Sequence, residues 1–166
     1  MVKEIIARSS MDNNILKLEP TEKKQKFQWL VGKVLIISND GKLLMGKRTE
    51  GVDFGKYEMP GGKMEVGELF TEGLKREIKE ETGLEVELKL PDTENISTIH
   101  PYLIVLDPRK RMAVFIEGKV VGDKLGGEGE LTDLKFYSVD EIRKLLNQGL
   151  IRNFVKPAVE KFIGER

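Results

Sequence analysis

The chain contains no cysteine and only one histidine among its 166 residues. Without cysteine it has no disulfide bond, no thiolate metal ligand and no cysteine nucleophile, which agrees with a reducing compartment. No apolar run approaches the ~18 residues of a membrane span, and the first residues lack the apolar core and cleavage site of a signal peptide. We therefore expect a cytoplasmic protein that does not cross a membrane.

An excess of charge of either sign is also missing, because 28 lysine and arginine residues balance 28 aspartate and glutamate residues. Broad electrostatic binding to nucleic acid or to a membrane surface is therefore not favoured. The hydrophobic fraction of 39% and the charged fraction of 34% are typical of a globular protein, and a chain of this length fits one domain with a substantial core.

The central elements are expected to be two paired strands and a helix. Residues 27–38 and 43–48 are rich in β-branched and apolar residues, and an Asp-Gly pair between them is a hairpin signal. Residues 68–82 are expected to form a helix, followed by Gly83 as its left-handed C-terminal cap. This helix carries most of the functional argument.

The order of the remaining elements indicates the fold class. Strands are expected at 85–90, 97–106, 112–121 and 134–139, and helices at 140–148 and within 153–166. Ser138 and Glu141 form a capping box at the start of the first of these helices. A short strand within 2–8 and a polar connector at 19–26 precede the main domain, so we divide the chain at 1–27 and 28–166. Strands, one helix, more strands and then helices predict an α+β domain around a twisted sheet.

Three glutamates border the apolar side of the expected helix at 68–82. At about 100° per residue, the apolar stripe consists of Phe70, Leu74 and Ile78. Glu77 and Glu81 project within about 20° of the Phe70 edge of this stripe, and Glu80 lies about 60° further round. Simple amphipathicity does not explain charged residues in this place.

A bound cation would explain them. Glutamates at these spacings repel one another by roughly 0.2–0.5 kcal/mol per exposed i,i+4 pair, and a cation reverses that sign. Oxygen ligands without histidine or cysteine suit a hard divalent ion, Mg²⁺ first and Mn²⁺ second. Gly61 and Gly62 can bring main-chain groups against a metal or a phosphate, and Gly73 suggests that another backbone approaches the helix. The alternative is an ordinary solvated helix in a glutamate-rich protein.

Residues 62–84 resemble the Nudix hydrolase family, whose box is G-x5-E-x7-R-E-U-x-E-E-x-G-U, with U a bulky aliphatic residue. The chain meets every fixed position, at Gly62, Glu68, Arg76, Glu77, Ile78, Glu80, Glu81, Gly83 and Leu84. The flanking segments MPGGK, GKR and LKFYSVDEI are similar as well. The resemblance covers roughly residues 28–146.

The resemblance implies a Nudix fold, an α/β/α sandwich with a mixed β-sheet. It also implies an enzyme that hydrolyses a pyrophosphate bond in a nucleoside diphosphate derivative with a divalent metal, Mg²⁺ or Mn²⁺. By position, Glu77, Glu80 and Glu81 would be metal ligands, helped by a main-chain carbonyl near Gly61. Arg76 would organise the loop-helix motif by ion pairing with Glu68.

The expected catalytic residues are Glu77, Glu81, Glu130 and Arg76. The anionic oxygens of a phosphoanhydride repel a nucleophile, so the reaction needs cations on those oxygens and a carboxylate that activates a water molecule. Candidates for this base are Glu77, Glu128 and Glu130. We favour Glu130, as base or extra metal ligand, because the glycines around it would let its loop close over a substrate.

Four residues are candidates for substrate contact. Arg48 ends an expected strand and is a candidate phosphate ligand, while Gly61 and Gly62 would contribute main-chain groups. Tyr57 is a candidate for stacking on a base, with core packing as the favoured alternative.

Other conspicuous residues are expected to be structural. A lone histidine beside a proline, His100, is more often structural than catalytic, and Trp29 is expected to pack in the core or on a sheet face. Arg109, Lys110 and Arg111 are expected to form a solvated basic turn.

The expected partner is a small nucleotide, with (d)NTPs or oxidised nucleotides favoured because only about 27 residues precede the main domain. Family members that cleave ADP-ribose or nucleotide sugars often have a longer N-terminal strand domain and a proline beyond the box. Pro101 lies near that position but not on it, so this substrate class is the alternative. A non-catalytic nucleotide-binding domain is a further alternative, which the intact box disfavours. A monomer or a homodimer is expected.

Overall fold

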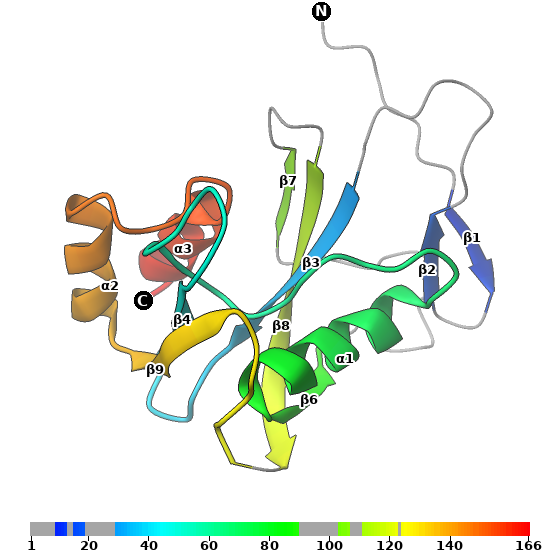
Figure 1. Cartoon of the computed structure of the whole chain (residues 1–166), viewed down its shortest axis with the longest axis horizontal. Coiled ribbons are helices and arrows are strands. Elements are labelled where there is room, and N and C mark those ends of the chain that lie inside the picture. The colour runs from blue at the N-terminus through cyan, green and yellow to red at the C-terminus, as the bar shows by residue number, and fades with distance from the viewer. Residues whose placement is uncertain (1–8, 13–14, 19–28, 90–102, 107–110, 123) are drawn as a thin grey trace, which may run out of the picture.

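The computed structural model describes residues 9–12, 15–18, 29–89, 103–106, 111–122 and 124–166 (Figure 1). The expected strand at 2–8 and the connector at 19–26 lie outside these residues, as do His100, Pro101, Arg109 and Lys110.

Nine strands and three helices make up the described part of the chain. In chain order these are β1 (Ser9–Asp12), β2 (Ile15–Leu18), β3 (Trp29–Ile36), β4 (Leu43–Arg48), β5 (Tyr57–Glu58), α1 (Phe70–Thr82), β6 (Glu85–Leu88), β7 (Leu103–Leu106), β8 (Arg111–Gly122), β9 (Leu131–Tyr137), α2 (Val139–Asn147) and α3 (Lys156–Gly164). The expected α+β class is confirmed.

The strands pair in both directions, so the sheet structure is mixed. Strand β3 runs parallel to β8, from Trp29 opposite Arg111 to Ile36 opposite Gly118. The long β8 also pairs antiparallel with β6 and β7. A second, antiparallel sheet has the order β5-β4-β9. The expected pairing of the strands at 27–38 and 43–48 is therefore wrong, because β3 pairs with β8 while β4 pairs with β5 and β9, and an isolated bridge between Ile37 and Leu43 joins their ends. Strands β1 and β2 form a separate hairpin, which the sequence analysis did not predict.

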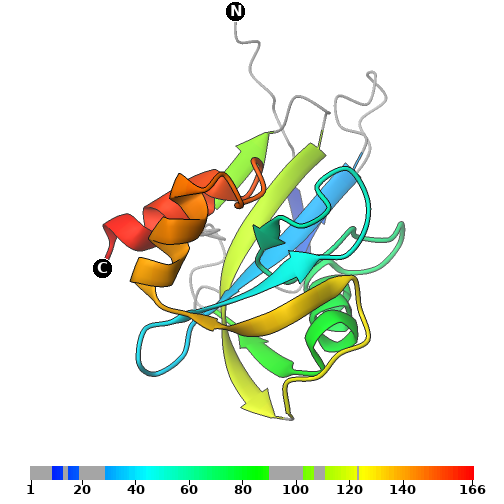
Figure 2. The same ribbon diagram turned by 60° about the vertical axis from the view of Figure 1, so that its left-hand side comes forward.

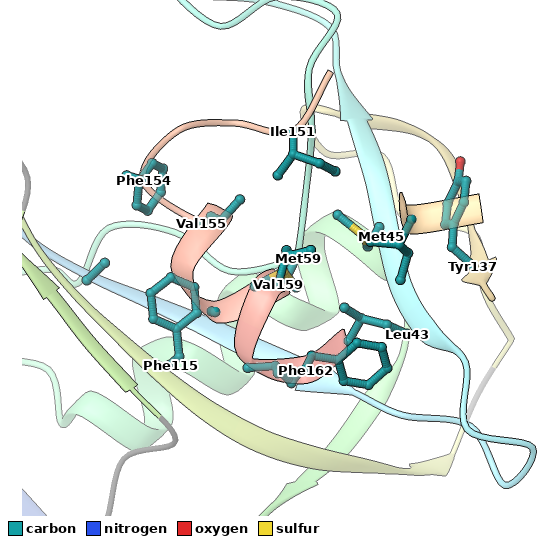
Figure 3. Close-up of a cluster of buried hydrophobic side chains, with 14 of the residues drawn as sticks. Leu43, Met45, Met59, Phe115, Tyr137, Ile151, Phe154, Val155, Val159 and Phe162 are labelled. Atoms are coloured by element: carbon teal, nitrogen blue, oxygen red, sulfur yellow. The ribbon is translucent and has the colours of Figure 1, made fainter. Parts of the chain in front are cut away.

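Helices cover both faces of the central strands (Figures 1 and 2). Along β3, Val34 and Ile36 pack in the cluster beneath α1, whereas Val31 and Leu35 pack in the cluster beneath α2 and α3. Figure 3 shows the second cluster, in which side chains of α3 lie against the strands. Strands buried on both faces are almost continuously apolar rather than alternating, which is why residues 27–38 are strongly hydrophobic.

The boundaries of α1 and α2 follow from their caps. Gly83 has a φ of 73° and donates its N–H to the Lys79 carbonyl, as expected for the cap of α1. The expected capping box at Ser138 and Glu141 is present. Helix α1 begins at Phe70 rather than at 68, because the Glu68 side chain accepts the N–H of Glu65 and closes a turn before the helix.

Strand β9 begins at Leu131 and not at 134, because Leu131 and Thr132 pair with Arg48 and Lys47 of β4. The expected loop between β8 and β9 is therefore shorter than its sequence suggested. Among the described helices, none has the length and apolar character needed to cross a membrane.

Candidate active site

The segment from Pro60 to Met64 lies along the edge of β3 that β8 leaves open. Gly32 donates its N–H to the Gly62 carbonyl at 2.9 Å, and Val34 donates to the Pro60 carbonyl at 3.0 Å. These bonds hold the Gly61-Gly62 turn between β3 and α1. Proline and glycine suit this edge position because the segment is paired along one side only.

Gly61 is required by the backbone of β3, and Gly62 lies directly against a side chain of α1. Gly61 has a φ of 128°, and a Cβ there would collide with the Gly32 carbonyl oxygen. A Cβ at Gly62 would collide with the carboxylate of Glu77. The turn therefore brings main chain directly against the side chains of α1.

Glu81 is the most deeply buried glutamate of α1, with 8% of its surface exposed. Its Oε2 accepts the N–H of Gly61 at 2.7 Å. Burial raises the pKa of Glu81 to about 7, against the opposing effect of Lys33. The positive charge near this carboxylate does not compensate for its burial. A cation beside it would therefore be stabilising.

Arg76 holds three of the other glutamates. Its Nε and Nη2 donate to the two oxygens of Glu68 at 3.3 and 3.0 Å, and its Nη1 donates to Glu77 at 3.0 Å and Glu80 at 3.2 Å. Hydrogen bonding to Glu68 raises the pKa of Arg76 further above its usual value. Arg76 thus ties the turn before α1 to the helix itself, the ion-pairing arrangement that the resemblance implied.

Gly73 accommodates a side chain and not the backbone that the sequence analysis expected. A Cβ at Gly73 would collide with the carboxylate of Glu68. The glycine lets Glu68 lie flat on the helix surface, where Arg76 reaches both of its oxygens.

Next to the turn lies a group of buried and partly buried charges that the sequence analysis did not connect, here named the Glu58 cluster: Lys33, Arg48, Asp53, Glu58 and Arg152. The Glu58 side chain is fully buried. Its Oε1 accepts from Arg48 at 2.7 Å, and its Oε2 accepts from Arg152 at 3.0 Å and lies 3.0 Å from Lys33 Nζ. Burial alone would raise the pKa of Glu58, but Lys33, Arg152 and Arg48 outweigh it and lower the pKa to about 2.

One sequence signal could have revealed this cluster. Lys33 interrupts an otherwise apolar strand, and a charge at such a place needs a buried partner. Nothing near Lys33 in the sequence identifies that partner. The cluster joins distant parts of the chain, since Glu58 and Arg152 are 94 residues apart.

Arg48 connects the Glu58 cluster to the loop that precedes β9. Besides its bond to Glu58, its Nη2 lies 3.4 Å from Oε2 of Glu130. The N–H of Thr49 donates to the Glu130 carbonyl at 3.0 Å, and the Thr49 hydroxyl donates to the same oxygen at 2.9 Å. The Glu130 side chain itself is half exposed.

The same loop packs closely on the last turn of α1. Gly126 donates its N–H to the Thr82 carbonyl at 2.8 Å. A Cβ at Gly127 would collide with the Glu81 carbonyl carbon, and a Cβ at Gly129 would lie 2.6 Å from Glu81 Cα. The glycines thus bring Glu128 and Glu130 to the C-terminal end of α1, where both side chains are exposed.

Tyr57, Trp29 and Arg111 each take part in a contact with an aromatic ring. The Tyr57 ring packs edge-on against Tyr137, with centroids 5.6 Å apart, and partly joins the core beneath α2 and α3. Trp29 is 44% exposed at the start of β3, with Lys63 over its ring. Arg111 belongs to β8 and lies over the Phe154 ring, so its expected place in a solvated turn is wrong.

The oxygen donors around Gly61 suit a hard divalent cation. Glu81 is buried with a raised pKa, and Glu77 lies against Gly62. Across the described ranges, however, no three acidic side chains already converge on one point as a metal cage. Arg76 instead holds Glu77 and Glu80, and Lys33 donates to the Gly61 carbonyl at 2.5 Å.

Several known proteins resemble this chain in sequence or in fold. A family model described as NUDIX domain matches residues 27–157. An ADP-ribose pyrophosphatase of Methanocaldococcus jannaschii is 28% identical over 130 residues, which cover 73% of this chain and 70% of that protein. An 8-oxo-dGTP diphosphatase of Haemophilus influenzae is 33% identical over 97 residues, which cover 57% and 67%. The crystal structure of a NUDIX-family hydrolase from Clostridium perfringens superposes with a TM-score of 0.64 at 24% identity, covering 82% of this chain and 96% of that one.

Proposed function

Because the chain belongs to the Nudix family and is a hydrolase of pyrophosphate bonds, we propose that its substrate is a nucleoside diphosphate derivative. We further propose that hydrolysis requires Mg²⁺ or Mn²⁺. The observation that carries this proposal is the buried Glu81 carboxylate, held by the Gly61 N–H at the edge of a glutamate cluster. A carboxylate with too little positive charge around it, in a cluster of oxygen donors, is suited to a hard cation.

The proposed cation ligands are Glu77, Glu80, Glu81 and the Gly61 carbonyl. When bound, the divalent ion would neutralise phosphate oxygens and lower the pKa of a water molecule. The Gly61 N–H fixes the orientation of the Glu81 carboxylate through Oε2. Glu77 and Glu80 must turn from Arg76 to join it, while Arg76 keeps its two bonds to Glu68 and so preserves the turn.

We propose Glu130 as the group that accepts the proton of the attacking water. Arg48 Nη2 lies beside its carboxylate, and two bonds from Thr49 fix its main chain. A half-exposed carboxylate is open to an incoming water molecule and can accept its proton. Arg48 thereby acts as a positioning residue for the base, in addition to its proposed contact with a substrate phosphate.

For the substrate, (d)NTPs or oxidised nucleotides are the first candidate. The similarity to an 8-oxo-dGTP diphosphatase, at 33% identity, supports it. ADP-ribose is the second candidate, because the similarity to an ADP-ribose pyrophosphatase extends over 73% of the chain. Tyr57 is proposed to contribute to base binding through the groove of about 440 Å³ that it lines with Asp133, Leu134, Lys135 and Tyr137.

A substrate panel tests both the reaction and the candidate substrates. Purified protein is incubated with ADP-ribose, nucleotide sugars, diadenosine polyphosphates and (d)NTPs including 8-oxo-dGTP, in the presence of Mg²⁺, Mn²⁺ or EDTA, and the products are separated by chromatography. We expect metal-dependent release of a nucleoside monophosphate from one class and none in EDTA. Hydrolysis that continues in EDTA would contradict the metal requirement, and cleavage of ADP-ribose alone would select the second candidate.

A further inference from the structure

Lys33 lies in the middle of β3, where only 2% of its surface is exposed. Its neighbours along the strand are apolar and buried, including Val31, Val34 and Leu35. Burying an ammonium group costs several kcal/mol unless close partners compensate for the lost hydration. A lysine in this place therefore requires a specific reason.

Neutralising Glu58 is not a sufficient reason. Each oxygen of Glu58 already accepts a hydrogen bond from an arginine, Oε1 from Arg48 at 2.7 Å and Oε2 from Arg152 at 3.0 Å. Two arginines can satisfy one carboxylate with charge-assisted bonds. Lys33 is a third cation at 3.0 Å from Glu58, although Arg152 also pairs with Asp53 and Arg48 with Glu130. The hydrogen bonds that Glu58 accepts therefore do not by themselves require Lys33.

The other partner of Lys33 is the Gly61 carbonyl oxygen, at 2.5 Å. The N–H of this same residue binds Glu81, and Lys33 also attracts the Glu81 carboxylate. The ammonium group therefore sits beside a carbonyl and a carboxylate that the proposed function assigns to a divalent ion.

We propose that Lys33 is a positioning residue that serves as a built-in cation. Its ammonium group holds the Gly61 carbonyl and offsets the charge of Glu81 while no divalent ion is bound, and it competes with the ion for that carbonyl. This inference rests on the proposed function only in taking Gly61 and Glu81 as ligands. It predicts that Gly61 and Glu81 are held in place before a metal binds, and that the affinity of the site for metal is lower than its ligands alone would give.

The test is the affinity for Mn²⁺ measured by titration calorimetry, with melting temperatures in EDTA and in Mn²⁺. Lys33→Met removes the charge and the donor, and Lys33→Gln removes the charge while keeping a donor. We expect both variants to bind Mn²⁺ at least about threefold more tightly than the wild type, because a neighbouring positive charge is gone. We also expect a lower melting temperature in EDTA and a larger rise on adding Mn²⁺.

Lys75→Met is the matched control, because it makes the same substitution at an exposed position on α1. It should leave the Mn²⁺ affinity unchanged within about twofold, since exposed charges are screened. A lysine that only stabilises the fold would lower stability without tightening metal binding, so unchanged or weaker affinity in both Lys33 variants overturns the proposal. Failure of both variants to fold with Mn²⁺ present also overturns it, because bound metal should replace the missing charge.

The wild type separates this inference from the proposed function. If the wild type neither binds Mn²⁺ nor hydrolyses any nucleotide, the proposed function fails. If the wild type does both and the Lys33 variants bind metal as it does, the inference about Lys33 alone fails.

Discussion

Glu81 and Glu58 are both buried carboxylates, yet their pKa values move in opposite directions. Burial raises that of Glu81 to about 7, whereas three cations overcome burial and lower that of Glu58 to about 2. The difference lies in the partners: Glu81 has one N–H bond and a cation that is shared with other groups, while Glu58 has direct bonds to two arginines. An added cation would therefore stabilise the surroundings of Glu81 more than those of Glu58.

Glu81→Gln should remove most of the turnover, with a decrease in kcat of about 100-fold or more, because the metal site loses a charged ligand. The fold should remain intact and gain stability at pH 8 in EDTA. The pKa of about 7 in the folded protein lies above the ordinary value of 4.5, so stability falls as the pH rises from 4.5 through 7. Removing that charge should raise the free energy of unfolding by about 1–2 kcal/mol. Full Mg²⁺-dependent activity in the variant would contradict the assignment.

Glu58→Gln should have the opposite effect on stability. Losing the carboxylate leaves Lys33, Arg48 and Arg152 without their common partner, which should lower the free energy of unfolding at pH 7 by about 3 kcal/mol. The pKa of about 2 in the folded protein lies below the ordinary value of 4.5, so the stabilisation by Glu58 is complete above pH 4.5 and is lost as the pH falls toward 2.

Urea unfolding of wild type and Glu58→Gln between pH 7 and pH 2 checks this dependence. The difference between the two proteins should shrink as the pH falls below 4.5, while the exposed-site control Glu87→Gln should stay close to the wild type throughout. A difference that is independent of pH would show that ionised Glu58 is not what stabilises the cluster.

At the scale of elements, the site depends on how two loops pack against α1. The Gly61-Gly62 turn meets the helix near Glu77 and Glu81, and the loop before β9 meets its last turn through Gly127 and Gly129. A Cβ in the second loop would collide with the backbone of α1, so glycine serves there for close approach to the helix. The second loop also carries Glu130 to Arg48.

Gly129→Ala should move the loop before β9 away from α1. The added Cβ would lie 2.6 Å from Glu81 Cα, so the loop or the helix end must shift. We expect a loss of about 1–3 kcal/mol in stability and a decrease in kcat of about tenfold or more, because small displacements of catalytic groups are costly. Gly164→Ala is the control, since a Cβ there meets nothing within 4 Å. Normal turnover of Gly129→Ala would exclude a role for this packing.

At the scale of the whole molecule, the proposed cation links the two sides of the site. Its ligands come from α1 and from the turn beside β3, so metal bound to the folded protein should stabilise the entire domain. At a concentration of about 100 times Kd, binding contributes about 2.7 kcal/mol. For a chain of this size the melting temperature should rise by about 5–10 °C.

Differential scanning calorimetry of the wild type in Mn²⁺ and in EDTA, at matched ionic strength, measures this rise. Glu81→Gln should show a clearly smaller shift than the wild type. An equal shift in both proteins would place the bound metal elsewhere, and no shift in either would favour the alternative that the glutamates of α1 are simply solvated.

The box helix and the reaction class could be predicted from the sequence because their evidence is local. The spacing of Glu77, Glu80 and Glu81 along one helix already places them on neighbouring faces, whatever the rest of the chain does. The Gly83 cap and the Ser138 capping box are local as well, since each bond joins residues three or four positions apart. The apolar strands at 27–38 and 43–48 likewise followed from composition and a turn signal.

Only the tertiary structure determined the electrostatic environment of each carboxylate, and with it the pKa. Glu58 meets Arg152 across 94 residues, and Glu130 meets Arg48 across 82, because strand pairing brings them together. The burial of Glu81 depends on glycines in another loop, and the position of Lys33 beside Gly61 depends on a segment that pairs with β3. Desolvation and charge compensation depend on all neighbours in space. The sequence by itself therefore determined which residues could do the chemistry, and the packing of distant segments decided their electrostatic environment.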